Sequence, residues 1–63
     1  MNKYEITIDK ALKEYEDHKP YKQHELMWII DRIEWCFKFR KIDYKSRMKF
    51  VNRVLSVQAM SQL

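Results

Sequence analysis

The sequence predicts an all-α fold, and three observations support that prediction. The chain contains no glycine and one proline, and glycine supplies the positive φ angles that tight β-hairpin turns require. Apolar residues recur every three or four positions along most of the chain, which is the spacing of a helix face. With 63 residues the chain has room for one domain. We therefore expect a single small helical domain over residues 1–63.

The first part of the chain predicts a short N-terminal helix that covers about residues 7–18. Its apolar positions are Tyr4, Ile8, Ala11, Leu12 and Tyr15. Thr7 or Asp9 is expected to cap the helix, which should end near His18, because the residue before Pro20 is biased away from helical angles. Residues 4–8 also alternate as a strand does, but no second strand candidate exists to pair with them.

A second helix is expected over residues of about 21–41, with Pro20 suited to its first turn. One apolar face carries Leu26, Ile30, Ile33 and Phe37, and a nearly opposite face carries Trp28, Trp35 and Phe39. A helix that is apolar on two faces is either enclosed by the protein or leaves one face for a partner.

A third helix is expected over residues of about 44–62, with Asp43 as its N-cap. The apolar face expected to be the main one carries Tyr44, Met48, Val51, Leu55 and Ala59. Three further residues widen this face on one side, namely Phe50, Val54 and Val57. The second and third helices would then form a helical hairpin, with the N-terminal helix packed across it.

The sequence leaves one alternative architecture open. The apolar positions keep nearly the same helical phase on both sides of the expected turn at residues 41–43, and residues 21–63 contain no glycine or proline. One continuous helix, about 60 Å long at 1.5 Å per residue, could therefore form a dimeric coiled coil. We favour the hairpin because so long a helix is rare in a small domain and Asp43 marks a helix start.

Composition argues against catalysis and against a membrane. The absence of glycine excludes glycine-rich phosphate loops, and His18, His24 and Cys36 are too few and too widely spaced for a structural zinc site. We expect no enzyme activity, no cofactor and no small-molecule substrate. The N-terminus lacks a signal-peptide pattern, no apolar run approaches a membrane span, and the unpaired Cys36 fits a reducing compartment. The expected location is the cytoplasm.

The aromatic residues of the second helix are the candidate protein-binding site. They are Trp28, Trp35 and Phe39, with Arg32 beside them. Tryptophan is enriched among residues that dominate binding energy, and exposed aromatic patches mark interfaces. The alternative interpretation is that the N-terminal helix or a second copy of the chain covers these residues as core.

The charges are distributed unevenly along the chain. Residues 1–34 carry six basic and eight acidic side chains, whereas residues 35–63 carry seven basic and one acidic. The cations that we single out as a nucleic-acid or acidic-partner site are Lys38, Arg40, Lys41, Lys45, Lys49 and Arg53. The alternative interpretation of this basic cluster is a solvated helix surface.

These features favour a small helical regulator or inhibitor that binds and occludes a larger protein. Two other functions stay open: a nucleic-acid-binding accessory protein that uses the basic cluster, and a structural homo-oligomer. Self-association as a homodimer is expected, because a domain of this size buries little surface by itself. A tiny chain without glycine and rich in lysine, isoleucine and tyrosine is also, by association alone, typical of accessory proteins of viruses or mobile elements.

Overall fold

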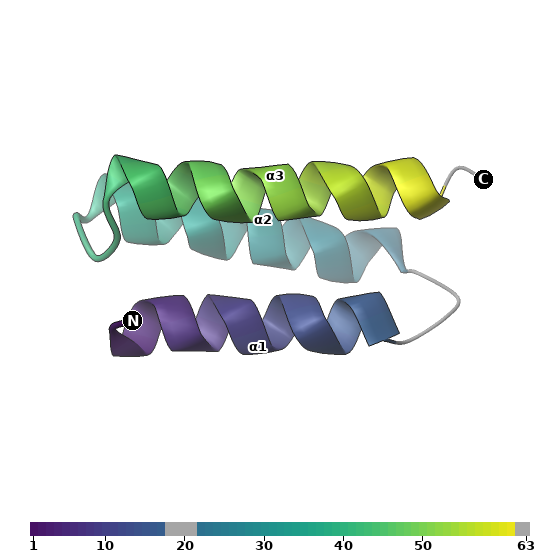
Figure 1. Ribbon diagram of the computed structural model, residues 1–63, viewed down its shortest axis with the longest axis horizontal. Coiled ribbons are helices and arrows are strands. Elements are labelled where there is room, and N and C mark those ends of the chain that lie inside the picture. The colour runs from purple at the N-terminus through teal and green to yellow at the C-terminus, as the bar shows by residue number, and fades with distance from the viewer. Residues whose placement is uncertain (18–21, 62–63) are drawn as a thin grey trace.

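The protein folds as a bundle of three helices. The structure, a computed structural model, describes residues 1–17 and 22–61, which form α1 (Lys3–Asp17), α2 (Gln23–Lys38) and α3 (Tyr44–Ser61). Helices α1 and α3 point in the same direction and α2 runs opposite to both (Figure 1). Every helix packs against the other two. The all-α fold and the helical hairpin are therefore as predicted, and the continuous helix is not formed.

Helix α1 begins four residues earlier than predicted, because Asn2 caps it. The Glu5 backbone N–H donates to Asn2 Oδ1 at 2.9 Å, and the Asn2 N–H donates to Glu5 Oε1 at 3.3 Å. This reciprocal pairing is a capping box. Thr7 and Asp9 were the wrong caps: both lie inside the helix, where the Thr7 hydroxyl donates to the Lys3 carbonyl at 2.9 Å. The predicted end at His18 lies outside the described residues.

The turn between α2 and α3 explains why the chain does not continue as one helix. Helix α2 ends at Lys38, and Arg40 adopts a left-handed backbone conformation with φ of 58°. The Lys41 N–H donates to the Cys36 carbonyl at 2.7 Å, and the Arg40 N–H donates to the Phe37 carbonyl at 3.1 Å. This pattern is the Schellman motif that closes helix C-termini.

Helix α3 begins as the sequence predicted. The Ser46 backbone N–H donates to Asp43 Oδ1 at 2.8 Å, which confirms Asp43 as the N-cap. Asn2 Nδ2 donates to the Lys41 carbonyl at 2.8 Å and so ties the start of α1 to the same turn. The N-terminus of α1 therefore lies beside the α2–α3 turn (Figure 1).

The core runs along the axis of the bundle and receives side chains from all three helices. Its buried residues are Ile8, Leu12, Tyr15, Leu26, Ile29, Ile33, Cys36, Ile42, Phe50, Val54 and Val57. The α1 face is the predicted one. The α2 face is rotated from the prediction: Ile29 and Cys36 are buried, whereas Ile30 and Phe37 lie at the core margin. The reason is that α2 packs against α1 as well as against α3.

The α3 core face differs most from the prediction. Phe50, Val54 and Val57 are at most 4% exposed, whereas Tyr44 and Leu55, which were placed at the centre of the apolar face, are 62% and 57% exposed. Helix α3 has apolar residues around much of its circumference, so periodicity alone does not select one face. Burial of the large Phe50 side chain selects the orientation that the structure adopts.

Candidate protein-docking surface

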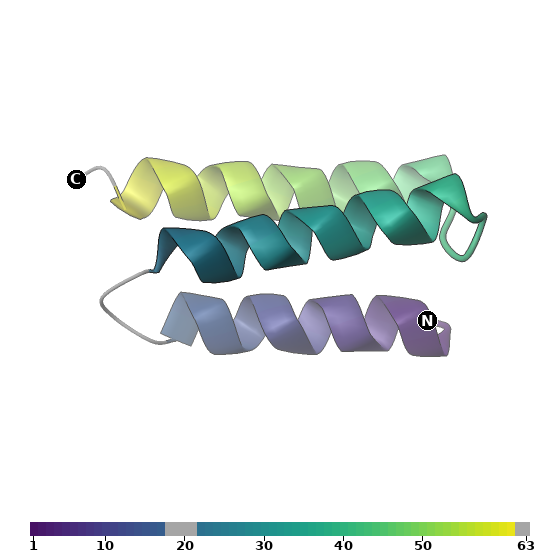
Figure 2. The ribbon, with the colours of Figure 1, turned by 180° about the vertical axis from the view of Figure 1, so that it is seen from behind.

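The outward side of α2 carries the candidate site. We call Trp28, Arg32, Trp35 and Phe39 the aromatic face. Figure 2 shows α2 at the front of the bundle, with α1 and α3 behind it. Trp28, Trp35 and Phe39 are 52%, 43% and 52% exposed, although the core beneath them is closed. The helices of one chain therefore leave these three rings half uncovered.

Contacts between neighbouring side chains order the aromatic face. The rings of Trp35 and Phe39 lie 4.9 Å apart between centroids, tilted by 41°, an attractive geometry for aromatic pairs. The Arg32 guanidinium lies 5.3 Å from the Trp28 ring centroid, and the Lys38 ammonium lies 5.8 Å from that of Phe39. Both distances fall within the range of cation–π attraction. The face thus combines three aromatic rings with two cations, Arg32 between the tryptophans and Lys38 beside Phe39.

The exposed charges next to the aromatic face are separated along α2. Glu25 and Asp31 are helix-surface neighbours of Trp28, three residues away on either side. Lys38 follows Trp35 by three residues, and the exposed Arg40 and Lys41 come next in the turn. The half of the face around Trp28 therefore has an acidic border, and the half that ends at the turn has a basic border.

Five of the six residues proposed for the basic cluster are exposed around the turn end of the bundle. They are Lys38, Arg40, Lys41, Lys45 and Lys49. The Lys41 ammonium makes a cation–π contact with Tyr4, 5.6 Å from the ring centroid. These five residues surround the turn, and they come from three segments: the end of α2, the turn itself and the first part of α3.

Arg53, the sixth residue, has a different role. Its guanidinium donates to Asp9 Oδ1 and, at 3.1 Å, to Glu16 Oε1, so it joins α3 to α1. The bond from Arg53 holds the pKa of the Asp9 carboxyl below its ordinary value. Arg53 is engaged inside the molecule, and the sequence could not show this because its acceptors lie 44 and 37 residues away.

Arg47, a further cation of the sequence around the turn, makes a second ion pair, which its position in the sequence did not indicate. Its guanidinium donates to both carboxylate oxygens of Glu34, at 3.1 and 3.2 Å, and lies 4.8 Å from the Phe37 ring centroid. These contacts join α3 to α2, whereas the Arg53 bonds join α3 to α1. The two arginines therefore hold α3 in place rather than extend the basic cluster.

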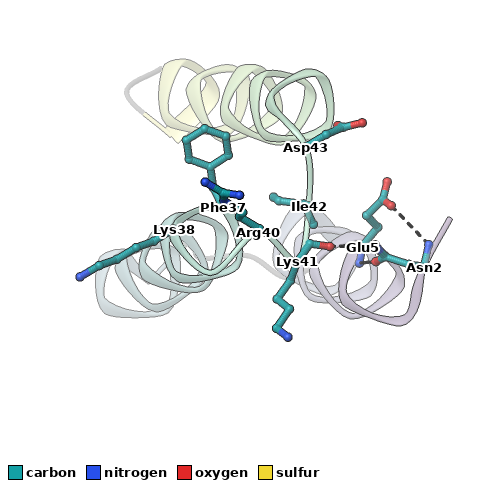
Figure 3. Close-up of a pocket in the computed structure, with 8 residues that line it drawn as sticks. All are labelled: Asn2, Glu5, Phe37, Lys38, Arg40, Lys41, Ile42 and Asp43. Atoms are coloured by element: carbon teal, nitrogen blue, oxygen red, sulfur yellow. Dashed lines mark hydrogen bonds between the residues drawn. The ribbon is translucent and has the colours of Figure 1, made fainter.

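An open hollow of about 650 Å³ lies at the turn end of the bundle. Figure 3 shows its lining residues, which are Asn2, Glu5, Phe37, Lys38, Arg40, Lys41, Ile42 and Asp43. Lys38 and Lys41 point outward in different directions rather than toward one point (Figure 3). The Glu5 carboxylate accepts a bond from the Asn2 N–H, and the Asp43 carboxylate accepts one from the Ser46 N–H. This hollow gathers no convergent set of reactive groups.

The described residues also bear on metal binding and thiol chemistry. Cys36 is 1% exposed, and burial raises the pKa of its thiol, which disfavours the reactive thiolate. Among residues 1–17 and 22–61, no group of three or more His, Cys, Asp or Glu side chains could hold a metal ion. Within the same residues, no helix has the length and hydropathy to cross a membrane.

Comparison of the chain with protein-family models, curated proteins and solved structures gave no significant match. The functional argument therefore depends on the surface itself. Trp28, Trp35, Phe39 and Arg32 were chosen from the sequence because they lie off the apolar face of α2, and the structure brings all four together on one exposed side.

Proposed function

We propose that this protein is a small helical regulator that binds a larger protein through the aromatic face and inhibits it by occluding part of its surface. The observation that supports this most directly is the half exposure of Trp28, Trp35 and Phe39 in a bundle whose core is already closed. Soluble proteins seldom leave large contiguous apolar patches uncovered unless another molecule covers them.

The energetic argument concerns the uncovered half of each ring. An aromatic side chain of about 200 Å² that is half exposed gains about 2.5 kcal/mol when the rest is buried, at 25 cal/mol/Å². Three such rings provide the apolar centre of a binding site, and the ordered Trp35–Phe39 pair reduces the entropy lost on binding. The charges at the margin then set the orientation of the partner.

Binding to nucleic acid is the second candidate, and the exposed cations at the turn end support it. Lys45 and Lys49 add to the turn residues, and Asp43 is the only acidic residue from position 35 onward. The binding constant would then fall steeply with salt, because phosphate neutralisation releases counterions. The loss of Arg53 to an internal ion pair weakens this candidate, as do Glu25 and Asp31 beside the aromatic face.

The test is capture of partners from the source cell's lysate with the tagged protein, with and without nuclease treatment, quantified by mass spectrometry. Three forms are compared: wild type, W28A/W35A, and Y44A/L55A. The last removes two exposed apolar side chains from α3 instead. We expect a stoichiometric protein with wild type and Y44A/L55A that is lost with W28A/W35A, while circular dichroism shows unchanged helicity.

Two results would contradict the proposal. Equal recovery with W28A/W35A would show that the aromatic face is not the interface. Recovery that disappears with nuclease for every form would instead favour the basic cluster and nucleic acid. A second arm, in which the captured partner's own activity is assayed with added protein, tests whether binding inhibits.

A further inference from the structure

We infer that the aromatic face also binds a second copy of this chain, with the two α2 helices antiparallel, to form a homodimer. The observation that carries this is the order of the exposed charges that border the aromatic face, from which we leave out Glu34 because it is paired with Arg47 of α3. From its N-terminal end the face is bordered by Glu25 and Asp31 and then by Arg32 and Lys38, with Trp28 and Trp35 between them. The acidic and basic halves meet at the centre of the helix.

Such a face is complementary to itself in one direction only. A twofold axis near the centre of α2, perpendicular to the helix, places the acidic half of each copy opposite the basic half of the other. A parallel arrangement would instead place like charges together, which is destabilising. Interfaces of this kind are isologous, so each favourable contact occurs twice.

The apolar centre of the face suits the same arrangement. Trp28 and Trp35 lie seven residues apart, two helical turns or about 10 Å at 1.5 Å per residue, on either side of the charge reversal. In an antiparallel pair, the tryptophans of the two copies meet around the axis and cover one another. The α3 surface around Tyr44 and Leu55 offers no comparable pattern, because the exposed charged residues within α3, Lys45 and Lys49, are both basic and no charged residue follows Arg53.

The dimer has a regulatory consequence that rests on the proposed function. If the same face binds the larger partner, the dimer and the complex exclude each other, and the dimer is a storage form from which monomer is released. The existence of the dimer does not depend on any partner. Purified protein therefore tests the dimer alone, and its failure is distinguishable from failure of the proposed function.

The experiment is sedimentation equilibrium of purified full-length chains over a range of concentrations. One variant, E25K/D31K, leaves only basic residues at the four charged positions 25, 31, 32 and 38. Another, R32E/K38E, leaves only acidic residues at these positions and does not change the basic turn. The control, K45E/K49E, makes the same change in net charge as R32E/K38E at exposed positions of α3. Circular dichroism melts establish that each variant is folded under the conditions used.

We expect wild type and K45E/K49E to dimerise, and each face variant alone to dimerise more weakly by roughly tenfold or more, because the axis repeats each reversed charge. An equimolar mixture of E25K/D31K and R32E/K38E should form a heterodimer. High salt should weaken that heterodimer.

Three results would overturn the inference. Wild type could stay monomeric at every concentration. R32E/K38E could dimerise as well as wild type, which would place the second copy on another surface. The folded variants could also fail to associate on mixing, which would show that charge order does not direct the pairing.

Discussion

Two outward surfaces of the bundle carry exposed apolar residues, and they differ in what surrounds them. On α2 and its C-terminal end, Trp28 contacts Arg32, and Phe39 contacts both Trp35 and Lys38. On α3, Leu55 lies in a stretch without charged residues, and Tyr44 rests against the edge of Phe37, 6.3 Å between centroids. The two surfaces are therefore alike in exposure but differ in their charges: acidic and basic residues follow one another along the α2 face, whereas the exposed charges within α3 are basic only.

The same two helices also show how apolar spacing can mislead. Tyr44 and Leu55 have the spacing of a core face, yet both are more than half exposed, whereas Phe50 is buried. On α2, the off-face tryptophans stayed outside as their position indicated. The difference arises because α2 has polar residues between its two apolar faces, whereas the two apolar faces of α3 merge. The following predictions test that contrast, from the largest expected effect to the smallest.

The largest effect is expected from truncating the α3 core residue. Phe50→Ala removes the largest fully buried side chain and should lower the free energy of unfolding by about 3–5 kcal/mol. Leu55→Ala, on the exposed side of the same helix, should change it by less than about 1 kcal/mol. Urea denaturation followed by circular dichroism measures both. Equal losses would mean that α3 is rotated from the orientation described.

A second contrast concerns two cations of the predicted basic cluster. Arg53→Met leaves Asp9 and Glu16 without their partly buried partner and should cost about 1–2 kcal/mol of stability. Lys49→Met, at an exposed position, should cost less than about 0.5 kcal/mol. Thermal melts at low and high salt compare them, and a larger loss for Lys49→Met would contradict the assignment of Arg53 to the α1–α3 contact.

The turn that sets α2 against α3 gives a stabilising prediction. Arg40 has a φ of 58°, where a side chain costs energy and glycine does not. Arg40→Gly should therefore raise the free energy of unfolding by about 0.5–1 kcal/mol. The matched control is Lys49→Gly inside α3, which should lower it by about 1 kcal/mol. A destabilising Arg40→Gly would argue against the left-handed turn and for a longer helix.

The pH dependence of stability should come partly from two aspartates. Hydrogen bonds from Arg53 lower the pKa of Asp9, and the Ser46 N–H lowers the pKa of Asp43. Each therefore contributes stability above the unfolded carboxyl pKa of about 4, and this stability is lost as the pH falls through the lower folded pKa. Asp43→Asn keeps a capping side chain but should flatten the acid limb of the melting temperature. An unchanged acid limb in that variant would contradict the contribution of Asp43.

Much of the fold could be predicted from the sequence because it depends on local signals. The helical spacing of Ile8, Leu12 and Tyr15 and the cap at Asp43 are readable within one element. The Asn2–Glu5 capping box was also readable, and the apolar spacing that begins at Tyr4 agrees with it, so the prediction of Thr7 or Asp9 as the cap was an avoidable error. In contrast, the choice of the α3 core face depends on packing between helices, which no local pattern encodes.

The candidate site was predictable to the same extent. Trp28 and Trp35 lie on one helix and Phe39 directly follows its last residue, so their shared face follows from spacing. The separation of Arg53 from the basic cluster does not, because it requires contacts with Asp9 and Glu16 across the bundle. The charge order along α2 could not be used as an argument about binding until the structure showed that this side of the helix is exposed.

The most direct test of the account is the solvent accessibility of the two tryptophans, which are the only two in the chain. Acrylamide quenching of their fluorescence is measured at a concentration where sedimentation shows monomer, and again where it shows dimer. The account predicts rings that are readily quenched in the folded monomer and shielded on association. Shielding in the folded monomer itself would contradict it, because the aromatic face would then belong to the core.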